Sequence, residues 1–131
     1  MAEVRDISEA LVKLAQDLRV YKRAFDVSLD VHKATLGFPV SEQYALSSQM
    51  RRASKSICAN LAEGFGKQSH SRPEFGRFLS MAVGSASEMQ VWCEYALALG
   101  YISQETHDAW QEGYDHILKM LQRLKETAGS L

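Results

Sequence analysis

Residues 49–66 read QMRRASKSICANLAEGFG, the pattern of an amphipathic helix with two separate faces. At about 100° per residue, apolar side chains form one stripe along it: Leu46, Met50, Ala53, Ile57 and Leu61. A second, wholly polar stripe lies about 100° away on the same helical wheel: Gln49, Arg52, Ser56, Asn60 and Glu63. Polar side chains kept in register beside a core stripe indicate a subunit interface or a ligand surface.

Apolar periodicity and capping residues predict three more long helices around this one. The first covers residues 18–35, with Asp17 as its N-cap, and residues 37–39 (Gly-Phe-Pro) end it. The helix containing the quoted stretch starts near Ser41 or Glu42, and Gly64 and Gly66 are its expected stops.

The two remaining helices follow in the second half of the chain. Ser71 and Glu74 form a capping box for a helix that runs to about residue 99, where Gly100 ends it. Ser103 is positioned to cap the last helix. The expected core positions of the two helices are Phe75, Phe78, Ala82, Ala86, Met89, Cys93 and Ala96, followed by Trp110, Tyr114, Ile117, Leu121 and Leu124.

Short connections make neighbouring helices antiparallel, so the predicted fold is all-α, an up-down-up-down four-helix bundle. One domain is expected over residues 1–131, in which residues 1–16 form an N-terminal extension with a short helix over 4–15. The first and third long helices carry more apolar surface than one core needs. A monomer would expose those faces, so we expect self-association.

Composition is that of an ordinary globular protein, with 46% hydrophobic and 24% charged residues among 131. Two cysteines do not form a disulfide framework and are typical of a reduced, cytoplasmic chain. The charged N-terminus does not resemble a signal peptide, and no 18-residue apolar run predicts a membrane span.

The net charge of −1 is unevenly distributed. Residues 1–77 carry 12 Lys/Arg and 9 Asp/Glu, a net +3, whereas residues 78–131 carry 3 Lys/Arg and 7 Asp/Glu, a net −4. The whole chain is therefore not suited to strong nonspecific binding of nucleic acid, but a local basic patch is compatible with its charge.

The sequence carries no recognisable catalytic, metal-binding or cofactor-binding motif. No Glu has a His three residues later, as a di-iron bundle would need, and P-loop, Rossmann and paired-cysteine motifs are absent. Glu112 and His116 lie four residues apart, a spacing that predicts a surface hydrogen bond rather than a metal site. We therefore expect no enzymatic activity, no cofactor and no metal.

A longer pattern surrounds the quoted stretch and extends from about residue 17 to residue 126. Its central residues are Phe38, Pro39, Glu42, Tyr44, Leu46, Gln49, Arg51, Arg52, Ala53, Ser56, Ile57, Asn60, Ala62, Glu63 and Gly64. This pattern resembles the four-helix-bundle proteins encoded in intervening sequences of bacterial 23S ribosomal RNA genes. The resemblance implies a ring-like homopentamer. A related branch of bundles serves as accessory subunits of reverse transcriptases in diversity-generating elements.

Two functions are compatible with these observations. The first is RNA or DNA binding through a basic surface repeated in the oligomer, with these candidate residues: Arg51, Lys55, Lys67, Arg72, Arg77, Arg19, Lys22 and Arg23. The second is a protein-interaction scaffold or accessory subunit without nucleic-acid contact, whose basic side chains are solvated or ion-paired. In either case the polar stripe is expected to be structural or interfacial, and Arg52 to pair with Glu63 or Glu88 across a subunit boundary.

Overall fold

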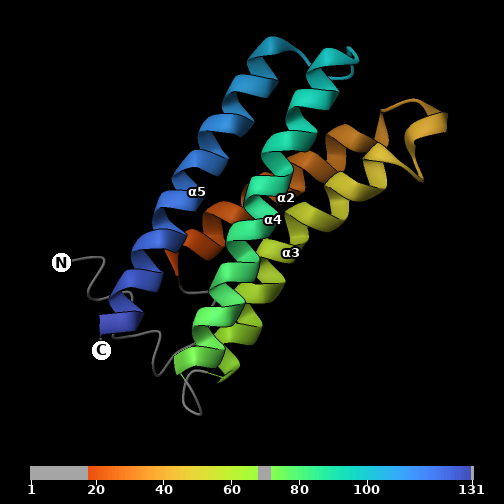
Figure 1. Ribbon diagram of the computed structural model, residues 1–131. Helices are drawn as coiled ribbons and strands as arrows, with labels where there is room; N and C mark the ends of the chain where they lie inside the picture. Colours follow the sequence, from red (N-terminus) through yellow and green to blue (C-terminus); the bar gives the residue numbers. More distant parts are fainter. Residues whose placement is uncertain (1–17, 68–71, 131) are drawn as a thin grey trace.

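The computed structural model describes residues 18–67 and 72–130, which form four helices packed side by side (Figure 1). The helices are α2 (Arg19–Leu36), α3 (Leu46–Lys67), α4 (Arg72–Ala98) and α5 (Gln104–Ser130), with a 3-10 turn, η2 (Val40–Glu42), between the first two. The described residues contain no strand, which confirms the all-α class. None of the described helices is long and apolar enough to cross a membrane.

Three predicted features lie outside the described residues: the helix over 4–15 within the extension 1–16, the Asp17 cap and the Ser71 cap. In the described part of the chain, α2 begins at Arg19, one residue later than expected. Leu18 occupies its N-cap position and makes no side-chain hydrogen bond there.

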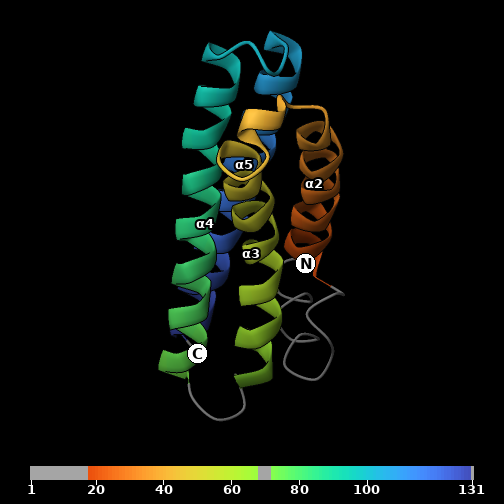
Figure 2. The same ribbon diagram turned by 90° about the vertical axis from the view of Figure 1, so that its right-hand side faces the viewer.

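Each helix packs against two neighbours. The α3–α4 contact is the most extensive, followed by α4–α5 and α2–α3, whereas α2 and α5 touch least. The α2–α3 and α4–α5 connections lie at the same end of the molecule (Figure 2). There the Tyr101 hydroxyl donates a 2.8 Å hydrogen bond to the Glu42 carboxylate, and the Tyr101 ring contacts buried Phe38 with centroids 5.2 Å apart.

The predicted core positions of α4 and α5 are all buried, as are those of α3. The first helix carries two apolar stripes, of which one lies largely in the core, with only Val27 partly buried. Val20, Ala24 and Val31 are buried in the core, whereas Phe25 and Leu29 remain 45% and 41% exposed. In the single chain, α2 therefore keeps an exposed apolar face, as the sequence predicts.

Both expected ends of α3 were wrong. Residues 40–42 form the 3-10 turn, and the α-helix starts only at Leu46. It starts late because a side chain between the turn and the helix forms hydrogen bonds with the end of α2 and the residues after it. The Gln43 amide donates to the carbonyls of Thr35 and Phe38 at 2.9 and 3.0 Å. The Glu42 carboxylate in turn accepts a hydrogen bond from the backbone N–H of Leu46 at 3.4 Å.

The helix also continues through Gly64 and Gly66 to Lys67. Gly64 is buried against α4, where an added Cβ would lie 3.0 Å from Cβ of Phe78 and 3.3 Å from Cδ1 of Phe75. This glycine therefore allows two helices to approach closely and does not stop a helix.

The turn between α4 and α5 follows the prediction. Gly100 has a φ of +79°, and the N–H groups of Gly100 and Tyr101 donate to the carbonyls of Leu97 and Ala96 at 3.0 and 2.8 Å. This pairing is a Schellman C-cap. Ser103 then caps α5, because its Oγ accepts the N–H of Thr106 at 3.1 Å.

Candidate nucleic-acid interface

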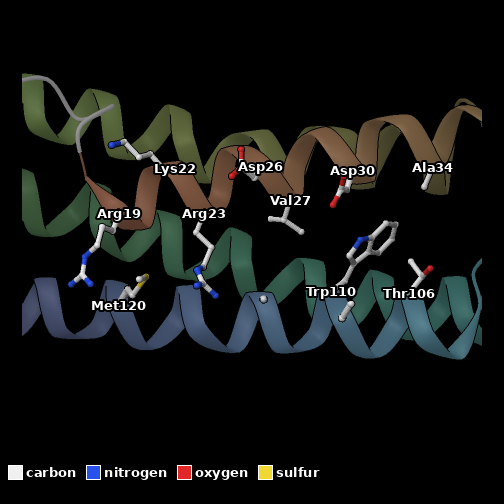
Figure 3. A pocket seen from close by; sticks show the side chains of 12 residues that line it. Arg19, Lys22, Arg23, Asp26, Val27, Asp30, Ala34, Thr106, Trp110 and Met120 are labelled. Carbon is white, nitrogen blue, oxygen red and sulfur yellow. The ribbon is translucent and has the colours of Figure 1, made fainter.

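Three of the eight predicted basic residues gather at the start of α2. Arg19, Lys22 and Arg23 are exposed and line one end of an 880 Å³ groove between α2 and α5. In Figure 3, Arg19 and Arg23 point from α2 toward α5, whereas Lys22 points away from α5. The groove exists because α2 and α5 are the neighbouring helices with the least contact.

The rest of the groove is not basic. Asp26 and Asp30 line it further along α2, and the α5 wall carries Trp110 (Figure 3). The remaining lining is small or apolar, apart from Thr106: Val27, Ala34, Ala109, Gly113 and Met120. A polyanion would therefore be attracted to the Arg19–Arg23 end and repelled by the carboxylates beyond it.

Arg23 is held across the groove by α5. Its guanidinium lies 2.8 Å from Nδ1 of His116, and because arginine can only donate, His116 accepts with a neutral nitrogen. The predicted surface bond of His116 with Glu112 was wrong, since its partner belongs to the neighbouring helix. The contact fixes the direction in which one arginine of the cluster points.

Arg51 faces inward and joins α3 to the end of α2. It is half-buried, and its guanidinium donates to Oγ1 of Thr35 at 3.1 Å and to the Gln43 carbonyl at 3.2 Å. Lys55, one turn further along α3, is exposed and lies 2.9 Å from Nδ1 of His32. Of this pair, only Lys55 presents its charge to solvent.

The remaining basic candidates belong to the junction of α3 and α4. Lys67 is the last residue of α3 and Arg72 the first of α4. Arg77 is exposed but forms a 2.7 Å ion pair with Glu74, and its guanidinium lies 4.7 Å from the centre of the Phe78 ring. Its charge is thus balanced locally.

The polar stripe of α3 lies along the seam with α4. Arg52 donates to Gln49 at 2.7 Å and lies 3.6 Å from Glu88, whose carboxylate also accepts from the Trp92 indole at 2.9 Å. Arg52 therefore lies beside one of the two expected carboxylates, Glu88, within its own chain.

Two residues in the second half of the stripe also form hydrogen bonds within the chain. Asn60 donates to the Ser56 carbonyl at 2.9 Å, and the Ser56 hydroxyl lies 2.9 Å from that of Ser85 on α4. Glu63, by contrast, is exposed. This order comes from α3–α4 packing, which supports the structural interpretation of the stripe.

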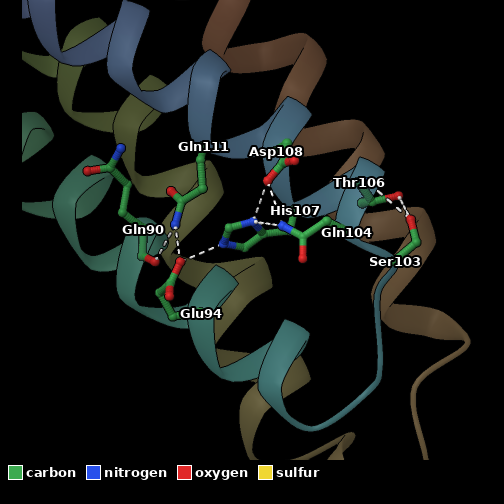
Figure 4. A network of polar contacts seen from close by, with 8 residues as sticks. All are labelled: Gln90, Glu94, Ser103, Gln104, Thr106, His107, Asp108 and Gln111. Carbon is green, nitrogen blue, oxygen red and sulfur yellow. Dashed lines mark hydrogen bonds and ion pairs between the residues drawn. The ribbon is translucent and has the colours of Figure 1, made fainter.

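Sequence analysis missed a polar cluster between α4 and α5 that is centred on His107 (Figure 4). His107 contacts Glu94, and Gln111 donates to the carbonyl of Gln90. Each of these two pairs is equidistant from the turn at residues 100–101, a register expected where a chain reverses at a short turn. This symmetric spacing about the turn is the signal in the sequence that could have identified the cluster.

The two cysteines are buried, and burial raises the pKa of Cys58 to about 11 and that of Cys93 to about 12. Both thiols therefore stay protonated at neutral pH. Within residues 18–67 and 72–130, no group of three His, Cys, Asp or Glu side chains is placed to hold a metal ion.

The family model described as 23S rRNA-intervening sequence protein matches residues 16–123. The chain belongs to this family. A crystal structure of a protein with unknown function from the S23 ribosomal protein family of Bacteroides thetaiotaomicron VPI-5482 is similar, with 27% sequence identity and a TM-score of 0.71. The match covers 82% of this chain and 95% of that protein. No curated protein matches the chain.

Family membership confirms the resemblance drawn from the residue pattern around 38–64 and agrees with the four-helix structure. The residues that carry the resemblance include Arg51 and Arg52, and the contacts above give both arginines a role within the subunit. At the start of α2, Arg19, Lys22 and Arg23 are exposed, and Arg23 is also bound by His116.

Proposed function

We propose that this family member is a non-enzymatic, self-associating helical bundle that binds RNA or DNA through a repeated basic surface. The observation that carries the proposal is the exposed cluster of Arg19, Lys22 and Arg23 at one end of the α2–α5 groove. Lysine and arginine contacts to phosphates supply affinity without reading base sequence. The name of the matched family associates such proteins with 23S rRNA genes, which is in keeping with a nucleic-acid partner.

The proposed assembly uses the apolar faces that a single chain leaves uncovered. On α2 these are Phe25 and Leu29. At the end of α4 and in the turn after it they are Tyr95 and Leu99, which are 55% and 52% exposed. Because the two faces belong to different parts of the chain, contact of one with the other is head-to-tail, and such contacts form a ring when the rotation between neighbours closes. The family resemblance implies five subunits. Successive helices run in opposite directions in Figures 1 and 2, in line with an up-down-up-down bundle.

A ring would turn a small cluster into a multivalent surface. Three cations on one subunit make only a few phosphate contacts, but copies around a ring engage one polyanion together and gain avidity. Arg51 and Arg77 are omitted from this surface because Arg51 is half-buried and the charge of Arg77 is paired with Glu74. Lys55 is retained, and Lys67 and Arg72 remain candidates at the junction of α3 and α4.

A second candidate function is a protein-interaction scaffold or accessory subunit. It is favoured by the α2–α3 connection, where Val40 and Tyr44 are 88% and 98% exposed. Phe38, Glu42 and Leu46 from the same part of the family pattern pack or bond within the subunit. Exposed apolar side chains of this kind suit contact with another protein better than contact with phosphates.

The proposal is tested by a matched pair of double variants. Lys22→Gln/Arg23→Gln removes two charges from the cluster, and Lys33→Gln/Lys119→Gln removes two exposed charges from elsewhere on α2 and α5. Affinity for duplex DNA and for structured RNA is measured across a salt series. Each lost phosphate contact lowers the slope of log affinity against log salt by about 0.9 on duplex DNA. The first variant alone should show this loss. Equal losses in both variants, or none in either, would contradict the proposed surface.

A further inference from the structure

His107 lies between two carboxylates that come from two helices (Figure 4). Its Nε2 is 2.5 Å from the Glu94 carboxylate on α4, and its Nδ1 is 2.9 Å from Asp108 on its own helix, α5. The imidazole is largely buried, with 12% of the side chain exposed. Gln111 extends the bridge by donating to Glu94 and to the Gln90 carbonyl, both at 3.0 Å.

The two carboxylate contacts favour a proton on each ring nitrogen. Ionised carboxylates only accept hydrogen bonds, and a neutral imidazole has a single N–H to donate. Only the imidazolium therefore satisfies both Glu94 and Asp108, and loss of one proton sets a nitrogen lone pair against a carboxylate oxygen. The Gln104 amide has two N–H donors and is 3.4 Å from Nδ1 and 2.9 Å from Asp108, so it offers Nδ1 only a longer, uncharged hydrogen bond in place of the charged pair with Asp108.

We propose that His107 is a proton-dependent latch that holds the N-terminal turns of α5 on α4. The opposite side of the same turns lines the groove against α2, through Thr106, Ala109 and Trp110 (Figure 3). Because α5 contacts α2 less than it contacts α4, release of the latch would loosen the wall of the groove. The latch is thus placed to change the groove with pH.

The charges around the latch determine the direction of the effect. The ionisable groups facing this side of α5 from α4 are Glu94 and the buried thiol of Cys93, and α5 itself adds Asp108 and Asp115, the latter bound by Gln90 at 2.7 Å. Hydrogen bonding to Glu94 and then to Asp108 raises the pKa of His107 above its usual value. The latch is therefore closed at and below the ordinary histidine pKa and opens as the pH rises through the raised value.

Trp110 lies three residues from His107 and serves as the probe in the 131-residue chain. Replacing Trp92 by Phe leaves Trp110 as the single tryptophan, since the chain has two. Acrylamide quenching of its emission is followed from about pH 5.5 to about pH 9, a range that spans histidine titration. We expect quenching to increase about twofold, with a midpoint above the usual value of about 6.5.

Three variants in the same background separate the latch from general effects of pH. His107→Gln should abolish the transition, Glu94→Gln should move its midpoint toward the ordinary histidine value, and His116→Gln should leave it unchanged. A flat profile for the parent, or the same transition in His107→Gln, would overturn the proposal. The experiment contains no nucleic acid, so its result is independent of the proposed function.

Discussion

Gly64 lies where α3 and α4 approach each other closely. An alanine there would place its Cβ 3.0 Å from Cβ of Phe78, a backbone-linked atom that cannot rotate away. We predict that Gly64→Ala destabilises the fold by about 1–3 kcal/mol in urea unfolding, the usual cost of overpacking.

Gly66 is the matched control for this prediction. It lies in the same helix, and an added Cβ would meet nothing within 4 Å. Because alanine is the better helix former, Gly66→Ala should be neutral or stabilising by up to about 1 kcal/mol. Similar losses in both variants would show that helix ending, rather than close packing, explains Gly64.

Arg51 and Lys55 lie one turn apart on α3, and their replacement should change the free energy of unfolding by different amounts. Arg51→Gln removes the donors that bind Thr35 and the Gln43 carbonyl in a half-buried position, and should cost about 1–3 kcal/mol of unfolding free energy. Lys55→Gln, at an exposed position one turn away, should change stability by less than about 0.5 kcal/mol. Chemical denaturation of both variants measures the difference. Equal stabilities would contradict the structural role assigned to Arg51.

At the scale of elements, α5 presents a buried hydroxyl to the core. The side chain of Tyr114 is fully buried, and its OH has no hydrogen-bond partner among the residues that the structure describes. Removing an unsatisfied polar group is close to neutral or favourable, so Tyr114→Phe should keep or raise stability by up to about 1 kcal/mol. Ile117→Ala, one turn along, should lose about 2–5 kcal/mol. A large loss in Tyr114→Phe, measured by thermal unfolding, would reveal a partner for the hydroxyl.

Helices α3 and α4 each contribute one buried thiol. Their pKa values of about 11 and about 12 leave far less thiolate at pH 8 than an unfolded cysteine has. We predict that a thiol-specific disulfide reagent reacts at least about a hundredfold more slowly with the native protein than with the protein in denaturant. Fast reaction of one thiol in the native state, located by peptide mass mapping, would contradict its burial.

Element by element, the sequence predicted what depends on local periodicity and capping. The apolar spacing in α4 and α5, the Gly100 C-cap and the Ser103 N-cap all agree with the structure. The limits of α3 were missed because they depend on distant partners. Gly64 responds to the phenylalanines of α4, and the late start at Leu46 follows from Gln43 binding back to α2. A glycine carries the same local signal in a helix stop and in a tight helix contact.

At the scale of the whole molecule, sequence reasoning placed the basic residues by charge alone and could not tell exposed cations from engaged ones. Arg51 is half-buried and Arg52 pairs with Glu88, because the folded chain brings Thr35, Gln43 and Glu88 to them, and Arg23 of the exposed α2 cluster is likewise brought to His116. His107 was missed because its partner Glu94 lies on another helix. Assembly and nucleic-acid binding remain predictions that rest on surfaces of the single chain.

The most direct test of the account is affinity for structured ribosomal RNA and duplex DNA across a salt series, with the mass of the protein in solution recorded in the same buffers. A multivalent basic surface predicts an oligomer whose affinity falls at least about a hundredfold between about 50 and about 200 mM salt. An intact oligomer that binds neither nucleic acid at low salt would contradict the proposed function and favour the protein scaffold.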